Sequence, residues 1–403
     1  MASNSFDHQL ADSESMSGLS VLLNVSSVPD QVVGAGKYIY QLACGLAQNL
    51  SHSLYLCSRK SDTGRWLNIT LDGRRNKLLP FAPSSKSSRI LYEEFAIAKL
   101  ALDLMAANPH LRDHFVLHGP HYVIPRNRQI VKAVTVHDLT FIEHPKWHER
   151  GKVLYFTQAI YFSLKAAQVV ICPSEYTAQK LIDIYRPKAP VVVARHGVDS
   201  DIFRISSPEL IREDTTIMSD FQISDRYILH VGTLEPRKNI PLLIEAFDAI
   251  AGDDGDLQLV LAGKDGWQVS SIDKAIGESK YKNRIKRLGY VTNRQVAALL
   301  RNASVVCYPS FEEGFGLPAL EALACGAPLV TTKDSAMSEV AGKAALLVDP
   351  GSVGDLAEAL REQLSGGSDV IWRQKLGLET AGNFTWEKSL KSHLHAYRLA
   401  LGG

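Results

Sequence analysis

The segment from Ala303 to Gly326 constrains the fold more than any other part of the sequence. An apolar run that ends at Tyr308 predicts a buried strand, and a loop containing two glycines follows it. Pro318 then predicts the start of a short helix and Gly326 its end, because proline suits a first helical turn and glycine suits the position after the last. A strand, a glycine-containing loop and a helix N-terminus together offer backbone N–H groups and the positive end of a helix dipole to an anion.

Two carboxylates flank this loop. Glu313 comes just before it, and Glu321 is predicted to lie in the first turn of the helix. Their spacing allows them to hold two different parts of one ligand. A phosphate at the helix end, with hydroxyl groups on the flanking carboxylates, describes a sugar nucleotide. In the structural alternative, Glu321 only complements the helix dipole and Glu313 is a solvated loop acid.

The sequence from Glu313 to Glu321 reads Glu-Gly-Phe-Gly-Leu-Pro-Ala-Leu-Glu, which resembles the Glu-x7-Glu signature of the retaining glycosyltransferases of family 4. The longer form of that signature is matched from Pro309 to Gly326. The resemblance implies that Glu313 orients the donor sugar and that Glu321 holds the ribose hydroxyls. It also implies that the loop binds the donor, through Gly314, Phe315, Gly316 and Leu317.

The first half of the chain opens with a predicted strand, Leu19–Val25, and a predicted helix, Lys37–Leu50. Gly34 and Gly36 lie where the strand passes to the helix. The third glycine of a dinucleotide-binding fingerprint is missing, since Ile39 takes its place, and the next strand ends in Ser-Arg-Lys rather than in an acid for a ribose. NAD binding is therefore disfavoured.

The family resemblance offers these glycines another function. In family 4 the glycines of the first loop lie with their backbone against the donor phosphates. Gly34 and Gly36 match that pattern, with Lys37 at a position where arginine is common. The alternative is a plain tight turn.

His137 and Asp138 end the second of two further predicted parallel strands, Phe115–His118 and Gln129–His137. Both residues would then lie at the carboxyl edge of the sheet, where ligands bind in open α/β folds. The run Thr-Val-His-Asp-Leu resembles the His-Asp element of the family, in which the histidine approaches the donor sugar and shapes the acceptor side. A structural histidine at a strand end is the alternative.

No metal site is predicted. His118 and His121 have a spacing that two metal ligands could use, but no acidic or cysteine partner accompanies them. The run Asp254-Gly-Asp256 imitates the Asp-x-Asp metal motif of the other large glycosyltransferase fold. Because it precedes a strand, at the sheet edge opposite the ligand crevice, we interpret it as a surface turn.

A basic pair begins the second half of the chain. Arg237 and Lys238 follow the predicted strand Tyr227–Val231 and precede a helix that Asn239 is predicted to cap. A guanidinium grips phosphate oxygens bidentately, and an ammonium adds a compact charge beside them. The position of the pair matches the diphosphate-binding pair of the family.

Two further donor-binding residues follow from the resemblance alone. Gly232 opens the loop that leads to the basic pair. Val291 ends a segment, Leu-Gly-Tyr-Val, that resembles the family segment whose backbone meets the nucleotide base.

Strands alternate with helices in both halves, which predicts α/β domains with open, mostly parallel, doubly wound sheets. The length of 403 residues fits two such domains. The resemblance implies the GT-B architecture, in which two Rossmann-like domains face each other across a cleft. We predict a flexible leader at 1–18, an acceptor-side domain at 19–205 with a linker at 200–225, a nucleotide-sugar-binding domain at 206–384, and a terminal helix at 385–403 that packs back on the first domain.

Composition and net charge limit the kinds of partner that the sequence predicts. A net charge of +1 argues against a nucleic-acid partner. No apolar stretch reaches the roughly 18 residues of a transmembrane helix, and no signal peptide is visible. The five scattered cysteines are interpreted as reduced core residues of a cytoplasmic protein. An amphipathic helix expected at Ser87–Ala106 would either contact an anionic membrane peripherally or pack on its own sheet.

The sequence therefore predicts a retaining, metal-independent glycosyltransferase without a cofactor, which moves a sugar from a nucleoside diphosphate to a glycan or lipid-linked acceptor. Two motifs look most like bacterial mannosyl- and rhamnosyltransferases of polysaccharide assembly, so GDP-mannose is the first candidate donor, ahead of a UDP-sugar. Three alternatives stay open: a nucleotide-sugar epimerase or hydrolase on the same fold, an NAD-linked oxidoreductase, and a catalytically silent sugar-nucleotide-binding subunit.

Overall fold

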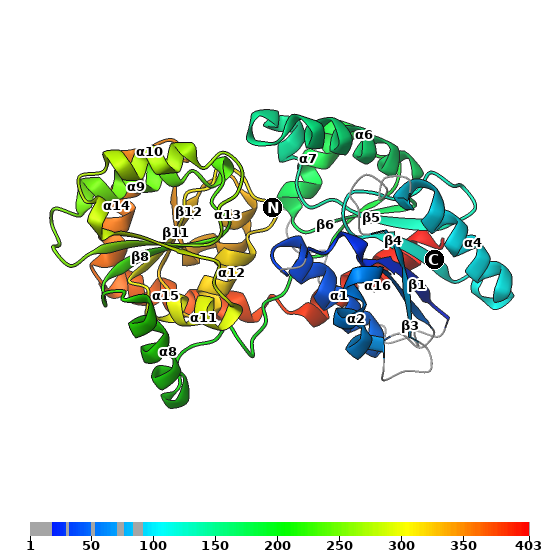
Figure 1. The fold of residues 1–403 in the computed structure, drawn as a ribbon, viewed down its shortest axis with the longest axis horizontal. Coiled ribbons are helices and arrows are strands. Elements are labelled where there is room, and N and C mark those ends of the chain that lie inside the picture. Colours follow the sequence, from blue (N-terminus) through cyan, green and yellow to red (C-terminus); the bar gives the residue numbers. More distant parts are fainter. Residues whose placement is uncertain (1–17, 30–31, 50–52, 71–75, 84–91, 403) are drawn as a thin grey trace, which may run out of the picture.

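The computed structural model describes residues 18–29, 32–49, 53–70, 76–83 and 92–402. These residues form two lobes that lie side by side, each built around one parallel sheet with helices over it (Figure 1). The two doubly wound parallel sheets expected from the sequence are confirmed. The predicted leader lies outside the described residues, apart from Gly18.

The N-terminal sheet has, within the described part of the chain, seven parallel strands in the order β3-β2-β1-β4-β5-β6-β7. The chain order reverses beside β1, and in an open α/β sheet such a switch point marks the ligand crevice beyond the carboxyl ends of the strands. The strands are β1 (Ser20–Asn24), β2 (Leu54–Arg59), β3 (Lys77–Ala82), β4 (Phe115–Gly119), β5 (Val131–Thr135), β6 (Val169–Cys172) and β7 (Val191–Val193).

Helices cover this sheet, and a separate apolar core cluster lies on each of its faces. The described part of the helix expected at Ser87–Ala106 begins with a π-helical turn, Tyr92–Ala96, and residues 84–91 lie outside the described residues. The helices are α1 (Ala35–Asn49), α2 (Thr63–Thr70), α4 (Ile97–Ala107), α5 (Thr140–Glu143), α6 (Arg150–Ala166) and α7 (Glu175–Tyr185).

The C-terminal sheet repeats this plan with the order β10-β9-β8-β11-β12-β13. Its strands are β8 (Tyr227–Val231), β9 (Gln258–Ala262), β10 (Ile285–Gly289), β11 (Val305–Tyr308), β12 (Leu329–Thr332) and β13 (Leu346–Val348). Its helices are α8 (Pro208–Phe221), α9 (Ile240–Ile250), α10 (Ser270–Glu278), α11 (Asn293–Asn302), α12 (Leu317–Ala324), α13 (Ala336–Ala341), α14 (Val353–Leu364) and α15 (Ser368–Gly382).

The prediction of a linker at residues 200–225 is wrong for most of that range, because the segment contains the helix α8. Ser207 caps this helix by accepting a hydrogen bond from the Leu210 N–H, and Pro208 occupies its first turn. Asp214 anchors α8 to α11 through a buried ion pair with Arg301, with a distance of 2.7 Å to Nε. Apart from Asp214, the acids of α8 that suggested a linker, Glu209, Glu213 and Asp220, are exposed.

The last helix, α16 (Trp386–Ala400), leaves the C-terminal lobe and packs on the N-terminal one (Figure 1). Leu390, Leu394 and Tyr397 are buried in the core of the N-terminal sheet. The start of α16 lies directly against Gly197, and only glycine fits there because a Cβ would lie 2.2 Å from the Trp386 nitrogen.

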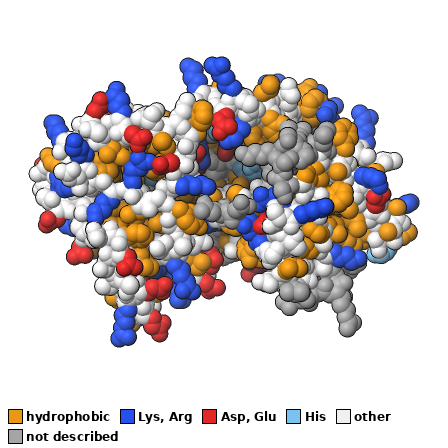
Figure 2. Space-filling view, in the orientation of Figure 1, with side chains coloured by type: hydrophobic (Ala, Val, Ile, Leu, Met, Phe, Trp, Pro, Cys, Tyr) orange, Lys and Arg blue, Asp and Glu red, His pale blue; other side chains and the backbone are white. Residues whose placement is uncertain are grey.

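Surface charge is mixed, with cationic and anionic side chains interspersed over both lobes on the face shown in Figure 2. None of the described helices offers an apolar run of the length that a bilayer crossing requires.

Candidate active site

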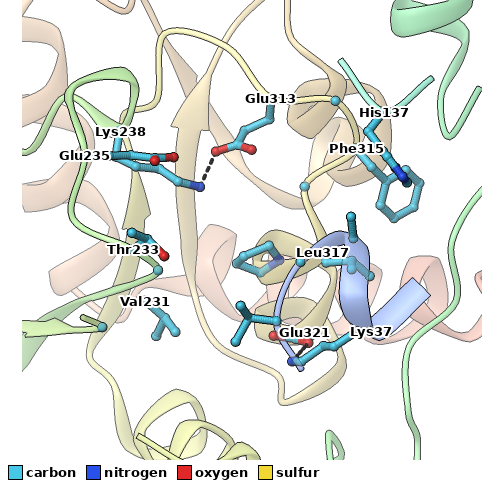
Figure 3. A pocket seen from close by; sticks show the side chains of 18 of the residues that line it. Lys37, His137, Val231, Thr233, Glu235, Lys238, Glu313, Phe315, Leu317 and Glu321 are labelled. Carbon is cyan, nitrogen blue, oxygen red and sulfur yellow. Dashed lines mark hydrogen bonds and ion pairs between the residues drawn. The ribbon is translucent and has the colours of Figure 1, made fainter. Parts of the chain in front are cut away.

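A pocket of about 380 Å³ lies between the two lobes and is lined from both (Figure 3). It brings together every residue predicted for the site except Gly36. Gly36 lies in the first turn of α1, where a Cβ would meet Pro29 at 3.2 Å. The neighbouring Gly34 does line the pocket, in a left-handed conformation with φ of +51° that favours glycine.

Glu313 is the most strongly paired acid of the pocket. One carboxylate oxygen lies 2.6 Å from Nη1 of Arg237, and the other pairs with the ammonium of Lys238. Burial opposes the charged form, but the two cations outweigh it and lower the pKa of the Glu313 carboxyl to about 2. Glu313 is therefore ionised throughout the neutral range. Glu235 also forms an ion pair with Arg237, and its carboxylate lies 2.7 Å from Nε of Arg237.

The basic pair occupies a short 3-10 turn, Pro236–Lys238, between β8 and α9. The Arg237 carbonyl accepts a hydrogen bond from Phe311 N–H at 2.9 Å, which ties this turn to the Glu313 loop. Asn239 occupies the predicted N-cap position of α9, but its side chain does not cap the helix. Its backbone is left-handed, with φ of +53°, and its side chain donates to the Pro350 carbonyl at 2.8 Å instead of accepting from the helix.

Glu321 lies in the second turn of α12, and not in the first as predicted, because the helix begins one residue earlier. Since α12 begins at Leu317, the Glu321 side chain belongs to the second turn and complements no free N–H group of the first. Its carboxylate is 2.7 Å from the Lys37 ammonium in the other lobe (Figure 3). Burial raises the pKa of Glu321, and Lys37 acts against that shift. This pair could not be predicted from the sequence, because nothing local links two residues so far apart in the chain.

The loop between the two acids is shaped by its glycines. Gly316 has φ of +97° and precedes α12, while Gly314 abuts the other lobe so closely that a Cβ would lie 1.8 Å from the His137 carbonyl oxygen. Phe315 and Leu317 line the pocket beside them. Glycine is thus required at 314 by the contact between lobes, which the sequence alone does not reveal.

The loops after β8, β9 and β10 form the far wall of the pocket. Gly232 has φ of +149°, and Gly263 approaches it so closely that a Cβ would lie 1.9 Å from the Gly232 oxygen. Val291 follows β10 and lines the pocket with Tyr290. These positions provide backbone and apolar surface at the carboxyl ends of the strands, where a flat base can lie.

His137 faces the pocket from the N-terminal lobe, next to Asp138. Its Nε2 donates to the Pro120 carbonyl at 2.8 Å, and burial lowers its pKa, so the ring is neutral near pH 7. The Asp138 carboxylate accepts from the Thr140 N–H and hydroxyl at 3.1 and 2.8 Å. His137 can therefore offer a neutral ring, but no charge, to a ligand.

A buried network of rings and hydroxyls, which was not predicted from the sequence, lies behind His137. Tyr38 packs edge-on against His137 and bonds to Nε2 of His393 at 2.8 Å. His118 bonds to the Tyr397 hydroxyl at 2.7 Å. His393 and Tyr397 belong to α16, so the terminal helix supports the wall that carries His137. No sequence signal joins these residues, which come from three distant segments.

Among the described residues, no group of three or more His, Cys, Asp or Glu side chains is arranged to hold a metal ion. The basic side chains that line the pocket are Lys37 from the N-terminal lobe and Arg237, Lys238 and Lys264 from the C-terminal lobe.

Comparisons with known proteins agree with this geometry. A model described as "Glycosyltransferase Family 4" matches residues 32–202, and one described as "Glycosyl transferases group 1" matches residues 214–398. The O-antigen chain mannosyltransferase B of Escherichia coli is 30% identical over 298 residues, which cover 72% of this chain and 76% of that protein. The D-inositol 3-phosphate glycosyltransferase of Kribbella flavida is 26% identical over 308 residues, covering 72% of this chain and 71% of that one.

Solved structures give the same fold. Sucrose-phosphate synthase from Thermosynechococcus elongatus superposes with a TM-score of 0.70 at 20% sequence identity, over 94% of this chain and 98% of that one. The chain therefore belongs to family 4 of the glycosyltransferases and has their two-domain GT-B fold.

Proposed function

We propose that this glycosyltransferase is retaining and independent of metal ions, and that it moves a sugar from a nucleoside diphosphate to an acceptor hydroxyl. The observation that carries the proposal is the Glu313–Arg237–Lys238 cluster in the pocket between the lobes. It joins two fixed cations with an acid that is ionised at neutral pH.

The chemical problem in this reaction is charge. Breaking the anomeric bond leaves an oxocarbenium-like sugar and a diphosphate on which negative charge grows. Arg237, Lys238 and the backbone N–H groups of the loop around Gly314–Gly316 would meet that charge from fixed positions. A preorganised site of this kind needs no reorganisation at the moment of bond cleavage, which is why side-chain cations can replace a divalent metal.

The two acids would hold the two sugars of the donor. Glu313 would orient the transferred sugar through its hydroxyls, because it lies beside the proposed diphosphate cations. Glu321 would accept the ribose hydroxyls, with Lys37 holding its carboxylate in place and opposing the rise in its pKa on burial. His137 would contact the transferred sugar from the other lobe and shape the acceptor side.

Retention of configuration favours attack on the same face as the leaving diphosphate, with a donor phosphate oxygen taking the acceptor proton. A covalent route would need a carboxylate on the opposite face of the sugar. The acids that line the pocket already have protein partners: Glu235 and Glu313 pair with Arg237, Glu321 pairs with Lys37, and Asp138 accepts from Thr140. These pairings support the route through the phosphate oxygen.

For the donor, GDP-mannose is the first candidate, because the Escherichia coli relative is described as a mannosyltransferase. The same relative is described as acting on an O-antigen chain, which supports a glycan acceptor and a role in polysaccharide assembly. A lipid-linked form of the acceptor and a cytoplasmic location stay predictions. Peripheral contact through the N-terminal lobe stays a prediction.

The decisive experiment is a thermal-shift screen of GDP-, UDP-, dTDP- and ADP-sugars in the absence of divalent metal. The donor with the largest shift is then incubated with a mannose oligosaccharide or with a polyprenyl-diphosphate-linked saccharide. NMR of the product reports the anomeric configuration. Donor consumption without acceptor would favour an epimerase or hydrolase, and binding without any turnover would favour a silent subunit. An inverted product would refute retention.

A further inference from the structure

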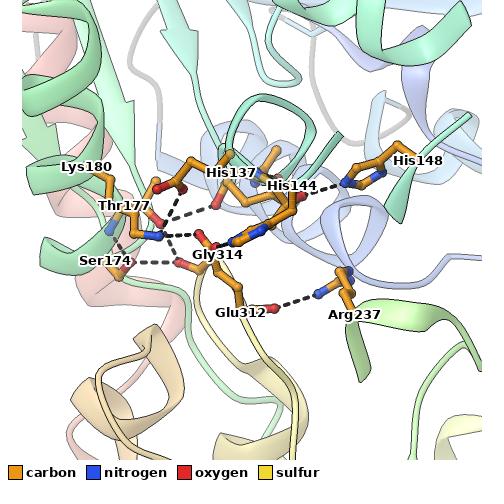
Figure 4. A network of polar contacts seen from close by, with 12 residues as sticks. His137, His144, His148, Ser174, Thr177, Lys180, Arg237, Glu312 and Gly314 are labelled. Carbon is orange, nitrogen blue, oxygen red and sulfur yellow. Dashed lines mark hydrogen bonds and ion pairs between the residues drawn. The ribbon is translucent and has the colours of Figure 1, made fainter. Parts of the chain in front are cut away.

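One helix of the N-terminal lobe makes an unusual set of contacts with the donor loop of the other lobe. Ser174, Thr177 and Lys180 follow one another at intervals of three positions at the start of α7, so they share one helix face. All three reach the segment Glu312–Gly314, directly beside Glu313 (Figure 4).

Two hydroxyls converge on one carbonyl oxygen. Ser174 Oγ donates to the Gly314 oxygen at 2.7 Å, and Thr177 Oγ1 donates to the same oxygen at 2.9 Å. The Thr177 hydroxyl also lies 3.5 Å from the His137 carbonyl oxygen. Because a peptide group is planar and trans, fixing the Gly314 carbonyl also fixes the N–H of Phe315, which points the opposite way, away from α7.

The end of α7 is itself held from the other lobe. The Glu339 carboxylate, on α13, accepts from the N–H groups of Glu175 and Tyr176 at 3.1 and 2.9 Å. A carboxylate at a helix N-terminus is favoured by the helix dipole and by charge-assisted hydrogen bonds. Arg195 lies 3.3 Å from the same carboxylate. The first turn of α7 is thus fixed between Glu339 on one side and the donor loop on the other.

Lys180 adds an ionic contact to the residue before Glu313. Its ammonium lies 2.8 Å from the Glu312 carboxylate and 2.9 Å from that of Glu143. His144 lies 3.3 Å from the second Glu312 oxygen. The Glu312 side chain is nearly buried, so this contact is shielded from solvent.

We propose that the N-terminal end of α7 is a positioning element for sugar transfer. The hydroxyls of Ser174 and Thr177 hold the Gly314 peptide so that the donor loop directs the Phe315 N–H toward the diphosphate. Glu339 keeps the helix end in register with the loop. These contacts exist only while the two lobes are together, so the donor loop has its active geometry only in that arrangement. The inference rests on the proposed function, since it takes this loop as part of the donor site.

The test compares Thr177→Val, which keeps the side-chain shape and removes the hydroxyl, with Thr177→Ser, which keeps the hydroxyl. Thr216→Val is the matched control, because the Thr216 hydroxyl is exposed on α8 and donates to its own helix at 3.1 Å. The donor is the one with the largest thermal shift in the screen above, and the acceptor is the one on which wild type turns it over faster. The measurements are kcat, KM for the donor, Kd for the nucleoside diphosphate, and Tm.

We expect Thr177→Val to lower kcat roughly tenfold, the scale of one lost hydrogen bond. Its Tm should stay close to wild type, and Thr177→Ser and Thr216→Val should keep wild-type kcat. Adding Glu339→Gln to Thr177→Val should lower kcat by less than the product of the two single effects, because both act through the same helix end.

Wild-type kcat in Thr177→Val would overturn the inference, and so would equal losses in Thr177→Val and Thr177→Ser, which would indicate a packing effect. A wild-type chain that turns over none of the donors would instead overturn the proposed function, and the inference with it.

Discussion

The carboxylate of Glu313 lies 2.6 Å from the guanidinium of Arg237, so two groups that we assign to different parts of the donor are partners in the protein itself. The acid expected to meet the sugar partly offsets the cations expected to meet the diphosphate. In the proposed mechanism its charge would have two effects. It would orient the sugar, and it would set how strongly Arg237 and Lys238 attract an anion.

We expect Arg237→Ala, Lys238→Ala and Glu313→Ala each to lower turnover by roughly 10²-fold or more, the scale measured for a lost transition-state donor. All three variants should keep the wild-type circular dichroism spectrum, because the affected groups line a pocket and leave the apolar clusters intact. Steady-state kinetics with saturating acceptor checks the prediction. Near-normal turnover in all three variants would remove the proposed mechanism.

The affinity for the nucleoside diphosphate should differ among these variants, even though each of them has a lower turnover. Arg237→Ala removes a cation and should weaken binding of the nucleoside diphosphate. Glu313→Gln removes the anion that neutralises Arg237 and Lys238, and should leave that affinity unchanged or increase it. Titration calorimetry with the nucleoside diphosphate alone measures both. A loss of affinity in Glu313→Gln as large as that in Arg237→Ala would contradict the assignment.

Glu321→Ala should weaken nucleotide binding more than it lowers kcat, because the proposed contact is with the ribose. A 2′,3′-dideoxy nucleotide provides the control. It lacks the hydroxyls that Glu321 would accept, so wild type and variant should bind it alike. Lys37→Met should also weaken binding of the ordinary nucleotide, since burial then raises the pKa of Glu321 without opposition from the ammonium. Unchanged nucleotide affinity in Glu321→Ala would show that the ribose assignment is wrong.

The part of the site that could be predicted from sequence is the part that is local in the chain. The strand, glycine loop and helix around Glu313 lie within one short segment whose turn and capping residues act on their neighbours. The same holds for Arg237 and Lys238, which follow directly after β8. Each motif could be placed at the carboxyl end of a strand without knowledge of the other lobe.

What could not be predicted depends on contacts between distant segments. Lys37 meets Glu321 only because the two lobes face each other, and the ring network behind His137 exists only because α16 returns to the first lobe. The helix α8 is a different case. Its start signal, Ser207 followed by Pro208, was present in the sequence, but the surrounding acids and serines were interpreted as a linker.

Treatment with a chelator should leave turnover unchanged, because the proposed site meets the diphosphate charge with Arg237, Lys238 and backbone N–H groups. The enzyme is dialysed against EDTA and assayed with and without added Mg²⁺ or Mn²⁺. Arg237→Ala treated in the same way serves as the comparison, and added metal should fail to restore its turnover. Loss of wild-type activity on chelation, with recovery on adding metal, would contradict a metal-independent mechanism.

We expect Glu312, at the interface between the lobes, to make the stability of the protein depend on pH. Burial raises the pKa of the Glu312 carboxyl to about 7, against the opposing effect of Lys180. Between about pH 4.5 and pH 7 the folded protein therefore holds a proton on Glu312 that the unfolded chain has already lost. The contribution of this group to the free energy of unfolding must fall as pH rises through that window, and it stays at its lowest value above it.

Glu312→Gln cannot ionise, so its stability relative to wild type should rise as the pH increases from 5 to 8. The difference between Gln and the protonated Glu312 side chain shifts the variant by a constant amount, and it is the slope of the stability difference with pH that carries the prediction. Thermal unfolding of both proteins at several pH values measures this slope, with Glu358→Gln, an exposed position on α14, as the control. A difference between Glu312→Gln and wild type that is constant across the window, or that decreases with pH, would show that Glu312 does not titrate there.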